Sequence, residues 1–233
     1  MGVFGCDFTD PAVFENGFPH RTFTGIRRDC PVAWHTPRDG AWHTPRDDDP
    51  GGVGFWSIAS YGATVALLDA EGQRVDHDGQ LAERLWSSIT LELARSPIDV
   101  SGLDDDRAAR VAAHEFARWC TPTASVSWTL RADYELGGHR ISTGESVTCW
   151  LASANRDESV FGRTAMDLDL RRFPNPHLAW RDAPPDALAD VTQRLVEFAR
   201  SGDRFELVAE PTWIRSTSQT ALLEAPVRRV GGR

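Results

Sequence analysis

The residues best suited to chemistry cluster near the middle of the chain. Glu115 and Arg118 are three positions apart, so on a helix the carboxylate and the guanidinium lie on one face and can pair. His114 directly precedes Glu115, and a histidine, which titrates near neutrality, could move a proton beside that carboxylate. A partly buried ion pair is more often architectural than catalytic. We therefore interpret Glu115 and Arg118 as a structural pair and His114 as a candidate acid/base group.

The segment after this pair predicts the end of a helix and then a small sheet. Pro122 cannot continue a helix and biases Thr121 towards extended geometry. Two β-rich runs follow, at 124–130 and 146–151, and the turn-rich stretch 134–141 between them is typical of a hairpin.

Three motifs occur in order along this region. They are E-x-x-R-W-x-T-P from Glu115, E-L-G-G-x-x-I-x-x-G-E-x-V from Glu135 and A-S-A-N-R-D-E-x-V-F from Ala152. Together they resemble the C-terminal half of a bacterial cytochrome P450, namely its K helix, the small sheet after it and the next helix. The stretch N-P-H-L-A-W at 175–180 resembles the N-P-H-L-A-F that leads into the haem-binding loop of that family. The stretches 7–20, 31–35 and 54–58 resemble its N-terminal helix and first strands.

The resemblance implies a haem iron held by a cysteine thiolate after the N-P-H-L-A-F stretch. Here Trp180 is followed by Arg-Asp-Ala-Pro-Pro, and no cysteine occurs after Cys149. The arginine that would hold a haem propionate falls at Ser127 or Trp128. The segment 73–113 is also too short for the long helices that the family has at this point. We therefore predict that the protein binds no haem; ligation by His177 or His139 is the alternative.

The resemblance further implies which side chains face the region that the haem would occupy. We expect acid/base chemistry from His177, His114 and Arg172, and substrate contacts from Ser125, Ser127, Trp128 and Trp180. Aromatic faces stabilise developing cations, which suits the chemistry of terpenoid and steroid frames. The structural alternative is that Trp128 fills the space that a haem propionate would occupy. His177 would then hydrogen-bond the backbone of the irregular segment in which it lies. The arginine that completes the family's charged triad aligns with Asp167, which puts that triad in doubt.

Three functions remain compatible with a P450 scaffold without haem. The first is a cofactor-independent enzyme for cyclisation, isomerisation, dehydration or hydrolysis of an apolar terpenoid, steroid or polyketide. The second is an accessory partner that stabilises a biosynthetic enzyme such as a glycosyltransferase. The third is a degenerate P450 remnant with no selected activity. The tandem duplication of a heptapeptide within 33–47 favours this interpretation. Phosphate-binding loops, nucleophile elbows and zinc helices are absent from the sequence.

Composition sets the broad class of the protein. The 233 residues are 41% hydrophobic and 25% charged, which is ordinary for a soluble globular protein. A net charge of −9 argues against nucleic acid and anionic membranes as partners. Neither a membrane span nor a signal peptide is evident, so we expect a cytoplasmic protein. Its four cysteines have no C-x-x-C spacing, so we expect reduced thiols and no zinc site.

We predict a single α+β domain over residues 1–233, a reduced P450-like fold that is mainly helical with small antiparallel sheets. Helices are expected at 10–15, 19–29, 61–70, 80–94, from about 101 through 115, and 185–200, with a last sheet at 205–211 and 221–227. The heptapeptide A-W-H-T-P-R-D occurs twice within 33–47. We interpret it as a tolerated duplication in a surface loop, with a metal site of its His and Asp residues as the alternative.

The helix predicted at 80–94 carries more apolar residues than one narrow stripe needs. These are Leu81, Leu85, Trp86, Ile89, Leu91 and Leu93. Because the family's distal helices are missing, we expect this surface to be covered by a second copy of the chain. The sequence thus predicts a homodimer through this helix.

Overall fold

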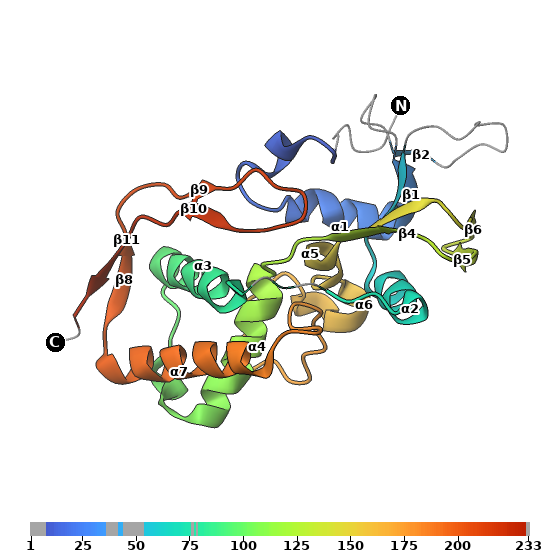
Figure 1. The fold of residues 1–233 in the computed structure, drawn as a ribbon. Coiled ribbons are helices and arrows are strands. Elements are labelled where there is room, and N and C mark those ends of the chain that lie inside the picture. The colour runs from blue at the N-terminus through green and yellow to red at the C-terminus, as the bar shows by residue number, and fades with distance from the viewer. Residues whose placement is uncertain (1–7, 36–41, 44–53, 76, 78, 232–233) are drawn as a thin grey trace.

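The computed structural model describes residues 8–35, 42–43, 54–75, 77 and 79–231, and its ribbon is shown in Figure 1. The α-helices are α1 (His20–Asp29), α2 (Tyr61–Glu71), α3 (Leu81–Arg95), α4 (Asp106–Cys120), α5 (Leu151–Ala154), α6 (Glu158–Phe161) and α7 (Pro185–Ser201). Short 3-10 turns are η1 (Pro11–Phe14), η2 (Ser101–Asp104) and η3 (Gly162–Thr164). Among the described residues, no helix is long and apolar enough to cross a bilayer.

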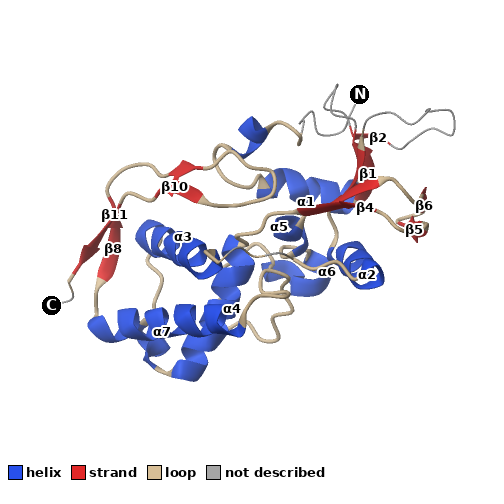
Figure 2. Ribbon diagram, viewed as in Figure 1, coloured by secondary structure: helices blue, strands red, loops and turns tan. Residues whose placement is uncertain are grey.

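The principal sheet has the strand order β2-β1-β3-β7-β4. Its strands are β1 (Val32–His35), β2 (Trp42–His43), β3 (Phe55–Ile58), β4 (Val126–Thr129) and β7 (Ser146–Cys149). All of its pairs are antiparallel except β3 with β7, which is parallel. Figure 2 shows the division into helices and small groups of strands. The predicted α+β class, mainly helical with small antiparallel sheets, is confirmed, with that one parallel pair as the exception.

Three smaller sheets have two strands each. The hairpin of β5 (Tyr134–Leu136) and β6 (His139–Ile141) turns at Gly137 and Gly138. Both glycines have positive φ, which a two-residue turn of this kind requires. The predicted last sheet is divided into two: β8 (Arg204–Leu207) pairs with β11 (Val227–Val230), and β9 (Thr212–Trp213) pairs with β10 (Leu222–Glu224).

The predicted helices form with the expected end signals. Asp105 is the N-cap of α4, because its carboxylate accepts hydrogen bonds from the backbone N–H groups of Arg107 and Ala108. Gly72 ends α2 with a φ of 59°, the left-handed conformation that a glycine cap adopts readily. Residues 101–105, which the sequence placed in one helix with 106–115, form η2 and the N-cap instead.

A helical core forms where α3, α4 and α7 pack together (Figure 1). Each helix has an apolar stripe along one face, as expected for helices around a shared core. Leu85 and Ile89 come from α3, Phe116 from α4, and Val191 and Leu195 from α7; all five are fully buried. Through α3, the short segment 73–113 thus contributes to this core.

An aromatic core forms where η1 and α1 pack against residues of the principal sheet. The rings of Phe14, Phe18 and Phe23 surround the indole of Trp150, with centroid distances of 5.9, 6.2 and 5.1 Å. The indole nitrogen of Trp150 donates to Ser57 Oγ at 2.7 Å, so its one polar atom is satisfied inside the core. This cluster joins the N-terminal residues to the strand and helix that come after the hairpin.

The two copies of the duplicated heptapeptide pair with each other. Trp34 lies opposite His43 and His35 opposite Trp42 in the antiparallel β1–β2 pair. Because β1 is buried along its length, its part of the first copy belongs to the sheet and is not in a surface loop as predicted. The remainder, 36–41 and 44–47, lies outside the described residues. Within the described ranges, no cluster of three or more His, Cys, Asp or Glu residues could hold a metal ion.

The structure removes the basis for an interface through α3. Leu81, Leu85, Ile89 and Leu91 are buried inside the chain, and Trp86 and Leu93 pack against the same helical core. The surplus of apolar residues is explained by contacts with α4 and α7 on one side and with the C-terminal strands on the other. A homodimer through this helix is therefore not supported, and the oligomeric state stays a prediction without an assigned surface.

We expect Leu85→Ala to lower the free energy of unfolding by about 2–5 kcal/mol, because it leaves a cavity in the helical core. Leu223→Ala is the matched control, since Leu223 is 67% exposed. That control should change stability by less than about 0.5 kcal/mol. Chemical denaturation of both variants measures the difference; equal effects would contradict the assignment of α3 to the core.

Candidate functional site

Glu115 is the centre of a buried polar network. Arg118 donates from Nε and Nη2 to the two oxygens of Glu115, at 2.8 Å each. The same guanidinium donates to the backbone carbonyls of Asn155, Ala165 and Asp167 at 2.8 to 2.9 Å. Both side chains are fully buried. The predicted structural pair is therefore present, and its hydrogen bonds connect α4 to the segments after α5 and α6.

Arg172 completes the charged triad that the sequence placed at Asp167. Its Nε donates to the Glu115 oxygens at 3.1 and 3.2 Å, while its Nη atoms donate to the carbonyls of Phe161 and Thr164. Asp167 contributes only its backbone carbonyl to these two arginines. The alignment with Asp167 was wrong by five positions. Arg172, predicted as catalytic, is placed in the structural network.

The two predicted catalytic histidines contact each other. His114 Nδ1 and His177 Nε2 are 3.0 Å apart, and the backbone N–H of Ala179 donates to His177 Nδ1 at 3.2 Å. Because His177 Nδ1 accepts, the ring proton lies on Nε2 and is donated to His114 Nδ1. His114 therefore pairs with His177, and the structure does not give it the predicted pairing with Glu115.

Burial controls the protonation of this histidine pair. It lowers the pKa of His177 to about 3, with added repulsion from His114 and Arg118. Burial also lowers the pKa of His114, and the positive charge of Arg110 lowers it further. Both rings are therefore neutral at pH 7, as their shared hydrogen bond requires.

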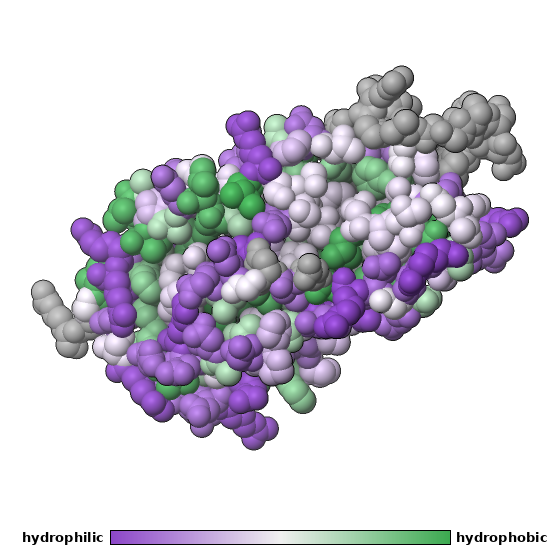
Figure 3. All heavy atoms as spheres, viewed as in Figure 1, coloured by the Kyte–Doolittle hydropathy of each residue, from purple (hydrophilic) through white to green (hydrophobic). Residues whose placement is uncertain are grey.

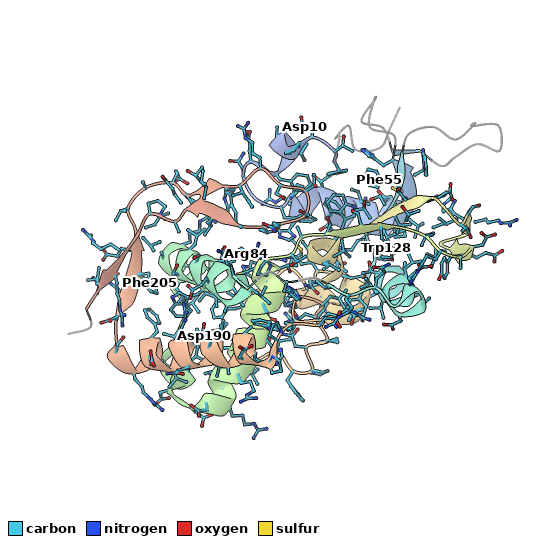
Figure 4. The ribbon with its side chains drawn as sticks, in the orientation of Figure 1. Asp10, Phe55, Arg84, Trp128, Asp190 and Phe205 are labelled. Carbon is cyan, nitrogen blue, oxygen red and sulfur yellow. The ribbon has the colours of Figure 1, made fainter. Side chains whose placement is uncertain are left out.

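Three of the predicted substrate-binding residues line one cavity, which we call the β4 cavity. Ser125, Ser127 and Trp128 form one wall of its volume of about 330 Å³. Arg84 lines it from α3, and Figure 4 labels Arg84 and Trp128 on their separate elements. Ser125 Oγ donates to the carbonyl of Thr217, and Ser127 Oγ is 2.8 Å from Thr148 Oγ1.

The lining of the β4 cavity is more polar than expected for a site that binds an apolar substrate. Its remaining lining residues are Gln73, Arg74, Thr123, Val126, Ser218 and Gln219. None of the predicted catalytic residues lines this cavity. Trp180, the fourth predicted substrate contact, packs against the helical core instead. The sequence-predicted site is therefore divided among four places: the β4 cavity, the histidine pair, the Glu115 network and the helical core.

A larger groove, which the sequence did not indicate, lies beside η2 and the start of α4. Its volume is about 620 Å³. Leu103, Ala108, Val111, Leu170 and Phe173 supply its apolar surface. We call it the Phe173 groove, because the ring of Phe173 is 85% exposed beside it. The sequence signal was weak, since isolated apolar residues next to the triad and at a helix start are common in cores as well.

Charged side chains at the rim of the Phe173 groove are already partly engaged. Asp105 caps α4, and Asp99 accepts from the backbone N–H of Ser101 at 3.0 Å. Arg107 and Arg171 also line the groove, so its charged lining residues are two cations and two carboxylates. The groove thus combines an apolar interior with a rim of no net charge.

The described cysteines do not fit the thiolate role that a P450 fold implies. Burial raises the pKa of Cys149 to about 12 within β7, and it also raises the pKa of Cys120 and Cys30. After Trp180, where the resemblance places the cysteine loop, Arg181 pairs with Asp69 and its carbonyl lies 2.8 Å from His77 Nε2. Cys6 lies outside the described residues. Haem absence itself stays a prediction.

Comparisons with known proteins find partial-length matches to cytochromes P450. No family model matches the chain. A putative cytochrome P450 126 of Mycobacterium tuberculosis is 36% identical over 161 residues, which are 65% of this chain and 39% of that protein. A methyl-branched lipid omega-hydroxylase of Mycobacterium bovis is 43% identical over 77 residues, 33% of this chain and 18% of that protein. The crystal structure of the P450 OxyD, involved in the biosynthesis of vancomycin-type antibiotics, matches 65% of this chain and 41% of its own with a TM-score of 0.57 and 27% identity.

These matches establish a reduced P450-like fold. The chain is a partial-length relative of the cytochromes P450. It spans about two-fifths of the first of these relatives, 39% of its length, so the activity of the whole enzymes does not transfer with the fold.

We expect Arg118→Met to lower the free energy of unfolding by about 3–5 kcal/mol, because it leaves part of the buried Glu115 charge uncompensated. Arg140→Met is the matched control: the Arg140–Asp133 pair is exposed, with side chains 74% and 49% accessible, and its loss should change stability little. Denaturant titration gives both values. Similar values for the two variants would argue against the network as a stabilising element.

We expect acid to destabilise the protein through the histidine pair. The folded-state pKa of His177 lies below its unfolded value of 6.5, so the unfolded chain binds more protons and stability falls as pH falls from about 7 towards 4. His177→Gln should make this loss shallower, with His139→Gln as the control. Some slope should persist, because the pKa of His20 is lowered in the same way. An unchanged slope in His177→Gln would contradict the pairing.

Proposed function

We propose that the protein is a P450-derived binding protein that holds an apolar small molecule in the Phe173 groove and acts without haem. The observation that carries this proposal is the groove itself. Its volume of about 620 Å³ falls within the range of small-molecule sites, about 300–1,000 Å³. Such sites combine an apolar lining with a few polar groups, and the groove has that composition.

The exposure of Phe173 supports a ligand that would cover its ring. A phenylalanine that is 85% exposed leaves a large apolar area in water. Leu170 and Val111 line the same groove, so the exposed ring is one of several apolar side chains there. A bound apolar molecule would remove this surface from water, at roughly 25 cal/mol per Å².

The charged residues that line the groove limit which class of ligand fits it. Two arginines and two carboxylates are among the lining residues, so the groove favours neither a strong anion nor a strong cation. We therefore propose an uncharged terpenoid, steroid, polyketide or branched lipid. The names of two relatives are compatible with this class: one hydroxylates methyl-branched lipids, and the other acts in the biosynthesis of an antibiotic.

Binding is favoured over cofactor-independent catalysis. The three residues predicted to carry acid/base steps, His177, His114 and Arg172, line neither this groove nor the β4 cavity. A general acid or base must come within hydrogen-bond reach of the reacting group. Cyclisation, isomerisation, dehydration or hydrolysis would therefore need other residues.

The second candidate is an accessory role beside a biosynthetic enzyme. Val208, after β8, is 57% exposed and Leu223, on β10, is 67% exposed. Figure 3 shows hydrophobic residues gathered at the left of the molecule, towards these C-terminal strands. An apolar surface at this end is a candidate contact for a partner protein.

The test is to locate binding with two blocking variants. Tryptophan fluorescence and calorimetry would be recorded with a panel of steroids, terpenoids, branched fatty alcohols and haemin. We expect an uncharged polycyclic or branched compound to bind. Ala108→Trp, which fills the Phe173 groove, should abolish binding, whereas Ser127→Trp, which fills the β4 cavity, should leave it intact. Phe173→Ala should weaken binding about 10- to 100-fold, from the loss of one buried aromatic ring.

The same panel separates the alternatives. Loss of binding in Ser127→Trp alone would move the ligand to the β4 cavity. Haemin that gives a thiolate-type Soret shift with carbon monoxide would overturn the haem-free proposal. No binding by any compound, together with co-purification with a biosynthetic enzyme that Leu223→Glu disrupts, would favour the accessory role.

A further inference from the structure

A separate recess lies between the start of α1, α3, the end of α4 and β9. Its volume is about 180 Å³, several times the roughly 30 Å³ that one water occupies in the liquid. The lining residues that matter here are Phe18, His20, Glu92, Trp119, Arg156 and Trp213. None of them lines the Phe173 groove, so a ligand in this recess would be independent of the proposed function.

Arg156 lines this recess with a buried and incompletely paired guanidinium. The residue is 2% exposed. Its Nη2 donates to the carbonyl of Trp119 at 2.7 Å, and its Cζ lies 4.2 Å from the centre of the Trp119 ring. Among the described residues, Nε and Nη1 have no hydrogen-bond partner. Buried donors without partners are uncommon and point to an absent water, ion or ligand.

The charge on Arg156 is also poorly balanced. No ion pair joins it to a carboxylate among the described residues, whereas Arg118 has the buried Glu115. Burial lowers the pKa of Arg156 to about 9; Arg118 and Arg27 add repulsion, which Cys120 and Glu92 offset in part. The guanidinium remains charged at pH 7. Glu92 lies near it but forms no ion pair with it among the described residues, so the buried charge is incompletely balanced and costly.

His20 adds a third unpaired nitrogen to the recess. Among the described residues, its Nδ1 has no hydrogen-bond partner. Burial, and then the charge of Arg156, lower the pKa of His20 well below its ordinary value, so the ring is neutral. A neutral imidazole can donate from Nδ1, and a guanidinium can only donate. An occupant that offers acceptor atoms would therefore pair with the guanidinium and, in the Nδ1–H tautomer, with His20 as well.

We propose that this recess binds a small organic carboxylate, with its oxygens towards Arg156 and His20. Charge-assisted hydrogen bonds between a guanidinium and a carboxylate are among the strongest in proteins. The rings of Phe18, Trp119 and Trp213 provide walls for a short apolar part, which an inorganic anion lacks. Because Nε and Nη1 are buried, the guanidinium must turn on its flexible stem towards the occupant.

One lining residue opposes this ligand and so provides the sharpest test. Glu92 accepts from Trp119 Nε1 at 3.0 Å and places a carboxylate in the recess. Glu92→Gln keeps that hydrogen bond, because its amide oxygen can accept, but removes the negative charge. The variant should bind a carboxylate about two- to fivefold more tightly.

The experiment measures the melting temperature of the full chain against propionate, inorganic phosphate and chloride at constant ionic strength. We expect a saturable rise with propionate, little response to phosphate and none to chloride. Arg156→Met should weaken the propionate response at least about tenfold, with Arg140→Met, an exposed arginine, as the matched control.

Each other outcome is decisive. A propionate response no larger than that of chloride means that water fills the recess, and the proposal is wrong. A phosphate response equal to that of propionate overturns the organic carboxylate in favour of an inorganic anion. If Arg156→Met does not fold, Glu92→Gln decides: unchanged or weaker propionate affinity in that variant overturns the proposal.

Discussion

A single buried carboxylate, that of Glu115, joins α4 to the irregular segment before α7. It accepts from Arg118 and Arg172, from the backbone N–H of Asp169 and from the amide of Asn175. A charge buried to this depth is tolerated only when such donors surround it. Because these donors come from α4 and from the long irregular segment before α7, the network gives that segment a defined path.

The path of that segment decides where the candidate sites lie. Leu170 and Phe173 flank the arginine that binds Glu115, so the network positions one wall of the Phe173 groove. His177 comes a few residues later and meets His114, which directly precedes Glu115. The residues that resemble the stretch before a haem-binding loop, 175–180, therefore pack against α4 in this chain.

The shortened middle of the chain has a second structural consequence. Without the long helices that the family resemblance implies, α3 packs directly on α4 and α7 and closes the helical core. Its apolar residues are used inside the chain, so its composition does not indicate an interface. The closure also brings Glu92 of α3 to Trp119 at the end of α4, beside the buried Arg156. The recess around Arg156 is thus a product of the same packing.

Local patterns in the sequence were sufficient to predict most helices and strands. The cap at Asp105, the glycine at Gly72 and the Gly137–Gly138 turn act within a few residues, so their effects are visible without a fold. The i, i+3 spacing likewise predicted the pair of Glu115 and Arg118, and ordered motifs predicted the P450-like fold. Ser125, Ser127 and Trp128 line one cavity because they lie within four positions of each other at and beside β4; their role in binding a substrate stays a prediction.

Only the tertiary structure decided which distant residues meet. Arg172, and not Asp167, reaches Glu115, because the irregular segment before α7 has no periodicity from which its path could be inferred. His177 meets His114 across 63 positions, and Phe173 is left exposed beside α4, for the same reason. The amphipathic pattern of α3 showed that one face is buried but could not say against what. Only the tertiary structure shows that α3 packs against α4 and α7. Contacts between residues far apart in the sequence place those two helices beside it.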